Sequence, residues 1–202
     1  MIPGILSILY KNIKGTIHVG AHRAEEMNIY LALGSEKILW YDANPELCSM
    51  ISNVIQNDTR QEIKNKAVSN FCGEVEFNIE QVNDGHSSSI LDLKLHKKYY
   101  PNINYSHKIK VDCVTLDSEN LSGYNFLATD AQGSDLNILI GAENLIRRDI
   151  NYIYTEVFTE ELYEGCGLLN QVDDYLNKLN FHRVYLSDTS YGWGDAFYIK
   201  KL

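Results

Sequence analysis

The hydrophobic pattern of this chain alternates between strand-like and helix-like segments from its first third onward. Thr16–Val19 is a β-branched, apolar run that predicts a buried strand. Ala24–Leu33 has apolar residues at helical spacing, and Gly34 follows it as a typical helix terminator. Lys37–Tyr41 predicts a second strand. This part of the chain therefore predicts a strand–helix–strand unit.

A second helix is signalled by the residues at its start. Asn44 is a favourable N-cap residue, Pro45 suits the first helical position, and Glu46 places an acid in the first turn. The apolar spacing then continues to about Ile55. We therefore expect a helix that begins directly after the second strand.

The alternation continues to the C-terminus without repeats. The remaining predicted strands are 64–69, 74–80, 108–115, 126–129, 152–157, 181–186 and 196–200, and the remaining predicted helices are 134–146 and 168–179. Polar neighbours separate Val75, Phe77 and Ile79, which indicates an antiparallel strand with one face in water. The connection over 187–195 is too short for a helical crossover, so the last two strands should pair antiparallel. The sequence thus predicts an α/β fold with a mostly parallel sheet, an antiparallel C-terminal hairpin and helices on both faces.

Two segments fall outside this alternation. Residues 81–105 are irregular and contain Gly85 to Ser89 and the aromatic cluster Tyr99-Tyr100. Long irregular segments in compact domains are often functional loops, so we expect either a lid over the substrate site or a plain surface insertion. Ile2–Tyr10 is apolar, but it has no basic segment before it and no small-residue cleavage site after it. We expect it to be a short helix packed on the domain.

Composition narrows the class of protein. With 202 residues, 45% hydrophobic and 22% charged, residues 1–202 are expected to form one globular domain. A net charge of −9 disfavours nucleic acid as a partner, and no apolar run reaches the roughly 18 residues of a membrane helix. The cysteines are far apart and predict neither a zinc site nor a disulfide framework: Cys48, Cys72, Cys113 and Cys166. We expect reduced thiols in a cytoplasmic protein, with no metal.

The turn after the first strand is the leading candidate for a cofactor site. Small residues at Gly20 and Ala21 would let a ligand approach the backbone, and Glu25 could reach back toward it. Asp42 ends the next strand 42 − 20 = 22 residues later, where an acid can accept hydrogen bonds from ribose hydroxyls. Alternatively, Gly20 is only a turn residue and Asp42 only a helix-terminal acid. The turn lacks the later glycines of G-x-G-x-x-G, since Ala21 and Ala24 stand there, which disfavours NAD and favours a ligand without a pyrophosphate.

Five segments of the chain, two of which contain these residues, resemble the FkbM family of S-adenosylmethionine-dependent methyltransferases. The matching segments are His18-Val19-Gly20-Ala21-His22-x-x-Glu25, Tyr41-Asp42-Ala43-Asn44-Pro45, Val114-Thr115-Leu116-Asp117, Leu127 to Asp135 and Thr155-Glu156-Val157, in the family's order. This chain departs from the family pattern at several positions. It has His18 in place of an acid, Ala24 in place of a glycine, Asp42 in place of a glutamate, Ala43 in place of a proline, and Gln132 and Asp135 in place of glutamates. The resemblance runs from about residue 16 to the C-terminus and implies the seven-stranded, Rossmann-like methyltransferase sheet.

The resemblance implies S-adenosylmethionine as cofactor and a set of site residues. The expected cofactor-binding residues are His18, Gly20, Ala21, Glu25, Asp42, Ala43, Ala67, Val68 and Asp130. Asp130 would lie beside the reactive methyl and act as the catalytic base, with Glu156 and His86 as further acid/base candidates. Asp130 could instead cap the helix that follows it.

The family also suggests the acceptor, a hydroxyl on a sugar, glycan or other small molecule. Thr129-Asp130-Ala131-Gln132 lacks the Asn-Pro-Pro-Tyr type of block, which disfavours an amino-group acceptor. Two alternatives stay open. One is a nucleotide- or NAD-binding enzyme on the same α/β frame. The other is a catalytically silent binding module, which the departures at His18 and Gln132 suggest.

Overall fold

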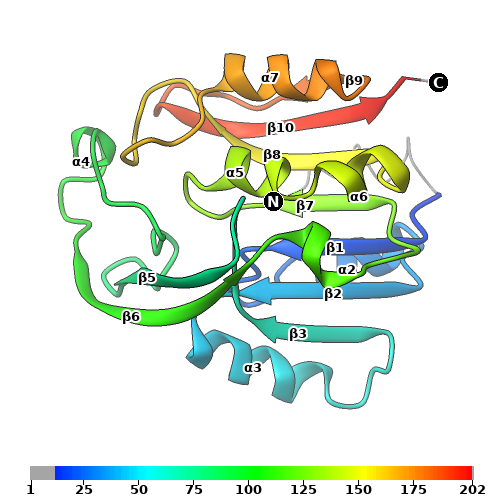
Figure 1. Cartoon of the computed structure of the whole chain (residues 1–202). Helices are drawn as coiled ribbons and strands as arrows, with labels where there is room; N and C mark the ends of the chain where they lie inside the picture. Colours follow the sequence, from blue (N-terminus) through cyan, green and yellow to red (C-terminus); the bar gives the residue numbers. More distant parts are fainter. Residues whose placement is uncertain (1–11, 202) are drawn as a thin grey trace.

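The computed structural model describes residues 12–201, and the predicted N-terminal helix lies outside the described residues. The main sheet has seven strands in the order β3-β2-β1-β7-β8-β10-β9 (Figure 1). These strands are β1 (Gly15–Val19), β2 (Lys37–Asp42), β3 (Gln61–Asn65), β7 (Phe126–Thr129), β8 (Tyr152–Phe158), β9 (Phe181–Leu186) and β10 (Trp193–Lys200). β10 pairs antiparallel with β8 and β9, whereas the other neighbouring strands pair parallel. The predicted mostly parallel sheet with an antiparallel C-terminal hairpin is confirmed.

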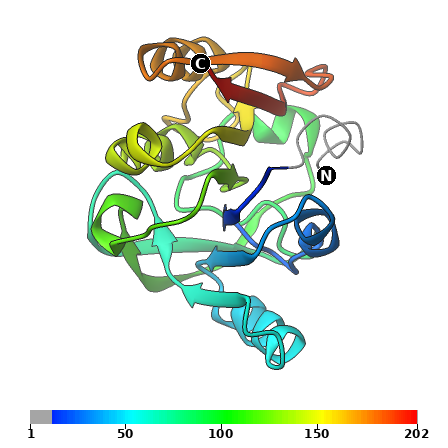
Figure 2. The ribbon, with the colours of Figure 1, turned by 90° about the vertical axis from the view of Figure 1, so that its right-hand side faces the viewer.

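Helices cover both faces of the sheet because its central strands are buried on both sides. Ile17 and Val19 of β1 join the core under α5 (Asp135–Ile140), α6 (Glu143–Arg148) and α7 (Leu169–Lys178). Trp40 of β2 packs on the opposite face with residues of α2 (Met27–Ala32) and α3 (Pro45–Ile55). Figure 2 looks down the strands and shows the two helical layers. Asn44 caps α3 as predicted, because its side chain accepts a hydrogen bond from the Glu46 amide at 2.9 Å.

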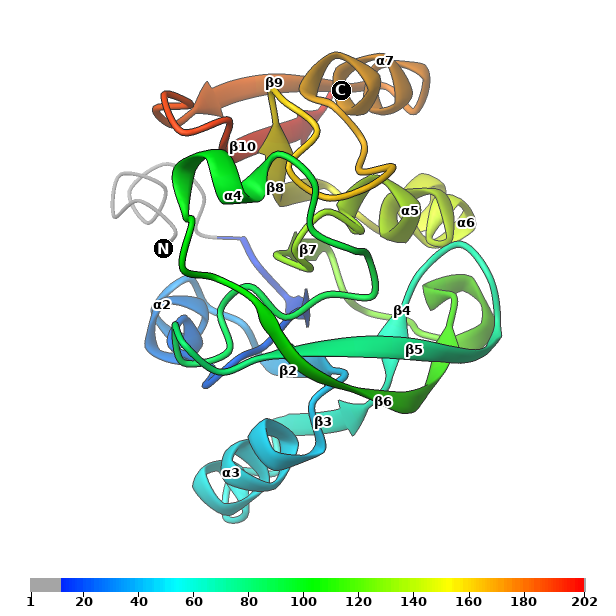
Figure 3. The ribbon, with the colours of Figure 1, turned by 90° about the vertical axis from the view of Figure 1, so that its left-hand side faces the viewer.

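A second, three-stranded sheet lies beside the main one. It has the order β4-β6-β5 and consists of β4 (Ala67–Val68), β5 (Gly73–Glu80) and β6 (Tyr105–Val114). β5 and β6 pair antiparallel along their whole length, as the alternation in β5 predicts. A short 3₁₀ helix, η1 (Leu116–Glu119), connects β6 toward β7. Figure 3 shows that this sheet lies near the carboxyl ends of the parallel strands, with the irregular segment in front of them.

Three predicted elements differ from the structure for local physical reasons. The strand predicted over 64–69 is divided into β3 and β4, because the chain leaves β2 and then pairs with β6. The helix predicted over 134–146 is divided into α5 and α6 near Gly141, where a Cβ would lie 2.1 Å from the Ser69 carbonyl oxygen. The helix predicted from Ala24 begins only at Met27, since Ala24 has a left-handed φ of 57°.

The irregular segment 81–105 is anchored at several points. It contains one short helix, α4 (His96–Tyr99). Isolated bridges join Asn78 to Ser89 and Leu93 to Tyr163, and the Trp193 indole donates to the Tyr100 hydroxyl at 3.0 Å. Within residues 12–201, every helix is too short or too polar to cross a lipid bilayer.

Candidate active site

The strand register places four of the predicted site residues at one level of the sheet. Val19 at the end of β1 pairs with Tyr41 of β2 and with Thr129 of β7, and Thr129 pairs with Thr155 of β8. The residues that follow these positions lie side by side at the carboxyl edge: Gly20, Asp42, Asp130 and Glu156. In open α/β sheets this edge is where ligands bind.

A cavity of about 320 Å³ opens at this edge. Eight of the predicted site residues line it: Gly20, Asp42, Ala43, Ala67, Val68, His86, Asp130 and Glu156. Three others, His18, Ala21 and Glu25, are not among its lining residues. The irregular segment 81–105 supplies much of the opposite wall, with residues such as Ser87, His96 and Tyr100.

The close approach of the ends of β1 and β7 requires a glycine at position 20. Its φ is +85°, and a Cβ there would lie 1.8 Å from the carbonyl oxygen of Asp130. The amides of Gly20 and Ala21 both donate to the Tyr41 carbonyl, at 2.9 and 3.0 Å. The turn therefore gives a ligand room, but these two amides already have an acceptor within the protein.

Asp42 is a buried carboxylate held by backbone amides. Its Oδ2 accepts from the His22 amide at 2.8 Å and its Oδ1 accepts from the Asn44 amide at 2.7 Å. Burial raises the pKa of Asp42 to about 6. A carboxylate has about four lone-pair sites, so two acceptor positions remain for a ligand in the cavity.

His18, Ala21 and Glu25 lie outside the cavity lining. His18 is buried, with Nδ1 2.6 Å from the Tyr30 hydroxyl and its ring 5.2 Å from that of Trp40. Burial lowers the pKa of His18 to about 4, so the imidazole is neutral at pH 7. Ala21 packs in the same core as Tyr30. Glu25 precedes α2 and accepts from His22 Nδ1 at 2.7 Å.

Gln132 connects the two acids of the candidate catalytic centre. Its Nε2 donates to Asp130 Oδ1 at 2.7 Å and lies 3.4 Å from both carboxyl oxygens of Glu156. Its Oε1 accepts from the Tyr163 hydroxyl. The sequence alone marks Gln132 only as a departure from the family pattern, because its contact with Tyr163 spans 31 positions of the chain.

Burial dominates the electrostatics of this centre, and the crowding of carboxyl groups adds to its effect. Asp130 is open to the cavity, yet desolvation by the surrounding protein raises its pKa. Burial raises the pKa of Glu156 well above its usual value. Asp195 of β10 pairs in register with Glu156, and burial together with the Asp130 charge raises its pKa to about 6. Asp195 was not predicted as a site residue, since it precedes the predicted strand 196–200.

Asp130 does not cap the helix that follows it. α5 begins at Asp135 with Ser134 as its N-cap residue, and Asp130 is hydrogen-bonded to Gln132. Asp135 instead organises the intervening turn, with its carboxylate accepting from the amides of Ala131 at 3.2 Å and Gly133 at 3.3 Å. The side chain of Asp130 is therefore available to the cavity.

Two solved methyltransferases share this architecture. A methyltransferase FkbM from Methylobacillus flagellatus KT superposes with a TM-score of 0.60 at 15% identity, over 92% of this chain and 43% of that one. The chain thus spans less than half of that solved protein. Magnesium protoporphyrin IX methyltransferase (ChlM) from Synechocystis PCC 6803, solved with bound S-adenosylmethionine, gives 0.53 at 10% identity, over 98% and 76%. The fold is that of the S-adenosylmethionine-dependent methyltransferases.

Sequence comparison then identifies the family. Residues 18–183 match the model of the methyltransferase FkbM domain, so this chain belongs to the FkbM methyltransferase family. Among curated proteins, the 2-O-methyltransferase NoeI of Sinorhizobium fredii (strain NBRC 101917 / NGR234) is 24% identical over 183 residues, which cover 85% of this chain and 74% of NoeI.

Proposed function

We propose that this protein transfers a methyl group from S-adenosylmethionine to a hydroxyl group of a sugar or another small molecule. The observation that carries this proposal is that Asp42 and Asp130, at the ends of β2 and β7, face a single cavity. The similarity to a 2-O-methyltransferase supports a hydroxyl as the acceptor.

The Asp42 side of the cavity fits the nucleoside part of the cofactor. The free acceptor positions of Asp42 would receive the two ribose hydroxyls, which are hydrogen-bond donors. Ala67 and Val68 of β4, together with Ala43, offer an apolar surface for adenine. A volume of about 320 Å³ lies within the range of roughly 300 to 1,000 Å³ that is usual for small-molecule sites.

The Asp130 side of the cavity fits the acceptor. When bound, S-adenosylmethionine supplies a methyl group on an electrophilic sulfonium, so the protein must orient the hydroxyl and accept its proton. Asp130 would take this proton at its carboxylate, and its raised pKa makes it a stronger base near neutral pH. Gln132 would hold the Asp130 carboxylate in position through its hydrogen bond of 2.7 Å.

The remaining predicted site residues would have supporting roles. Glu156, whose burial raises its pKa well above the usual value, would position the acceptor hydroxyl through its carboxyl group. Gly20 would leave room for the cofactor, and His18, Ala21 and Glu25 would shape the Gly20 turn from outside the cavity lining. His86 lines the cavity from segment 81–105, which would act as a lid that excludes water.

Ligand binding tests the cofactor assignment first. Thermal unfolding should be measured with S-adenosylmethionine, S-adenosylhomocysteine and NAD in parallel. We expect the first two to raise the melting temperature, with about 2.7 kcal/mol of stabilisation at one hundred times the dissociation constant. A shift with NAD alone, or no shift at millimolar S-adenosylmethionine, would contradict the proposal.

Methyl transfer tests the reaction itself. The purified protein should be incubated with S-adenosylmethionine labelled in its methyl group and with sugars that carry free hydroxyls. We expect label in an alkali-stable ether on the sugar. Tight cofactor binding without transfer to any hydroxyl acceptor would instead favour a silent binding module.

A further inference from the structure

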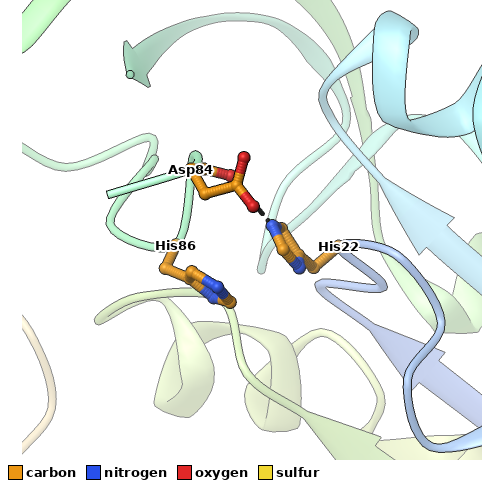
Figure 4. A group of neighbouring side chains, drawn as sticks. All are labelled: His22, Asp84 and His86. Carbon is orange, nitrogen blue, oxygen red and sulfur yellow. Dashed lines mark hydrogen bonds between the residues drawn. The ribbon is translucent and has the colours of Figure 1, made fainter. Parts of the chain in front are cut away.

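Three potential metal ligands meet at the rim of the cavity, where the turn after β1 faces segment 81–105. His22, Asp84 and His86 each offer one ligand atom, and these atoms all lie within 4.8 Å of one another (Figure 4). We propose that His22, Asp84 and His86 form a binding site for a divalent transition-metal cation of the zinc type. The site joins the turn after β1 to segment 81–105.

The donor set is suited to zinc. Zn²⁺ in proteins is bound by imidazole nitrogens at about 2.0 to 2.1 Å and carboxylate oxygens at about 2.0 to 2.2 Å, and sites with three protein ligands keep the fourth position open. The ligand atoms about a tetrahedral zinc are therefore roughly 3.3 to 3.5 Å apart. Asp84 and His86 are exposed, so small side-chain rotations can close the present separation.

His22 is already oriented as a metal ligand. Its Nδ1 lies 2.7 Å from Glu25 Oε1, and its Nε2 lies 3.0 Å from the backbone carbonyl of Asp84. Metal-bound histidines usually donate their second ring N–H to a carboxylate, which fixes the ring and the tautomer. Glu25 provides this second contact. Nε2 of His22 points toward Asp84, and a bound cation would take the place of the proton on Nε2.

The local geometry also brings the three side chains together. His86 stacks on His22, with ring centroids 4.0 Å apart, so both imidazoles lie on one side of the Asp84 turn. Arg23 pairs with Asp84 Oδ1 at 2.6 Å, which leaves Oδ2 free. Asp84 has a left-handed φ of 60°, and Gly85 follows with 89°, so a tight turn brings Asp84 and His86 to the same place.

The proposed cation site would join two walls of the cavity. The backbone amide of His22 donates to Asp42, while Gly85 and His86 line the opposite wall. A bound cation would fix these two walls to each other on one side of the cavity. Cation binding at this site can be measured without S-adenosylmethionine, so its test does not depend on methyl transfer.

Zinc binding can be measured by competition with a chromophoric chelator. The protein should carry no histidine tag, should be treated with EDTA, and should contain Cys72→Ser, which removes the exposed thiol. We expect one Zn²⁺ per chain. His86→Ala and Asp84→Asn should each weaken binding at least tenfold, and Glu25→Gln should weaken it less.

Two exposed histidines outside the cluster serve as matched controls. His107→Ala and His182→Ala should bind Zn²⁺ within twofold of the parent. Co²⁺ gives an independent readout, since a tetrahedral site produces visible absorption bands that His86→Ala should abolish. Absence of stoichiometric Zn²⁺ binding would overturn the proposal, as would equal affinities of His86→Ala, Asp84→Asn and the two controls.

Discussion

At the scale of single residues, Asp42 and Asp130 carry different parts of the proposed chemistry. Both are acids at strand ends on the same cavity, but their hydrogen bonds differ. Asp42 is fixed by the amides of His22 and Asn44, whereas Asp130 is held by the side chain of Gln132. Their substitutions should therefore separate cofactor binding from turnover.

Replacement of Asp42 by Ala should weaken cofactor binding. It removes a charged acceptor for two hydroxyls, which contributes about 1.5 to 3 kcal/mol, a loss of roughly 10- to 150-fold in affinity. It also leaves the His22 and Asn44 amides without their acceptor, so the free energy of unfolding should fall. Calorimetric titration with S-adenosylhomocysteine and urea unfolding measure the two effects. Asp42→Glu keeps the charge and should bind more tightly than Asp42→Ala, and equal affinity of wild type and Asp42→Ala would place the ribose elsewhere.

Replacement of Asp130 by Asn should lower turnover without weakening cofactor binding. Asn keeps the size and an oxygen that can accept from Gln132, but it cannot take the proton. Turnover should fall by about 10² to 10⁴ with cofactor affinity nearly unchanged. Single-turnover methyl transfer and calorimetry measure these quantities on the same sample. Full activity in Asp130→Asn would move the role of base to Glu156 or His86.

At the scale of elements, the contact between the ends of β1 and β7 determines where the cavity can form. Gly20 and Asp130 follow these two strands, and the Asp130 amide donates to the Val19 carbonyl at 2.9 Å. The missing side chain of Gly20 permits this approach. The candidate site thus depends on one glycine at a strand junction.

Gly20→Ala should destabilise the protein more than other glycine substitutions. A Cβ would lie 1.8 Å from the Asp130 carbonyl oxygen at a φ of +85°, which adds a backbone clash to conformational strain. We expect a loss of about 2 to 4 kcal/mol in the free energy of unfolding, measured in urea. Gly165→Ala is the control for strain alone, because its φ is +73° with nothing within 4 Å, and about 1 kcal/mol is expected there. Similar losses in the two variants would show that the strand junction adapts.

At the scale of the whole molecule, the cluster of carboxyl groups formed by Asp135, Glu156 and Asp195 should set the pH dependence of stability. Burial is the main cause and the charge of Asp130 the second cause of the raised pKa values of Asp135, about 7, and Asp195, about 6. The same two causes raise the pKa of Glu156 well above its usual value. The folded state then binds more protons than the unfolded state, so stability is present at low pH and is lost as pH rises from about 4 to about 7. His18, with its pKa lowered to about 4, acts in the opposite direction between about 4 and 6.5, and so does His96, whose pKa burial also lowers. Asp42, with its pKa raised to about 6, adds to the effect of the carboxyl groups.

We therefore expect a lower urea midpoint at pH 7.5 than at pH 5 for the protein without ligand. Asp135→Asn removes one of the titrating groups and keeps an oxygen for the Ala131 or Gly133 amide, so the difference between the two pH values should shrink. A midpoint that rises between pH 5 and pH 7.5 would contradict this account of the cluster.

The sequence by itself determined the class of fold and most of its elements. Strands such as Thr16–Val19 and the helix from Pro45 to Ile55 follow from local signals, namely β-branched runs and an Asn-Pro helix start. The short connection over 187–195 fixed the antiparallel end, because a helical crossover needs more residues. These features depend on neighbours in the chain, so periodicity and capping residues reveal them.

Only the tertiary structure decided which of the predicted side chains reach the cavity and which distant residues contact them. Gln132 meets Tyr163, and His22 meets Asp84 62 positions away, through contacts that leave no periodic signal in the sequence. The division of the predicted strand 64–69 likewise depends on whether β2 or β6 is the partner. Local sequence specifies the backbone conformation of each segment, but the site arises from the packing of distant segments, and their relative positions are fixed only by the folded core.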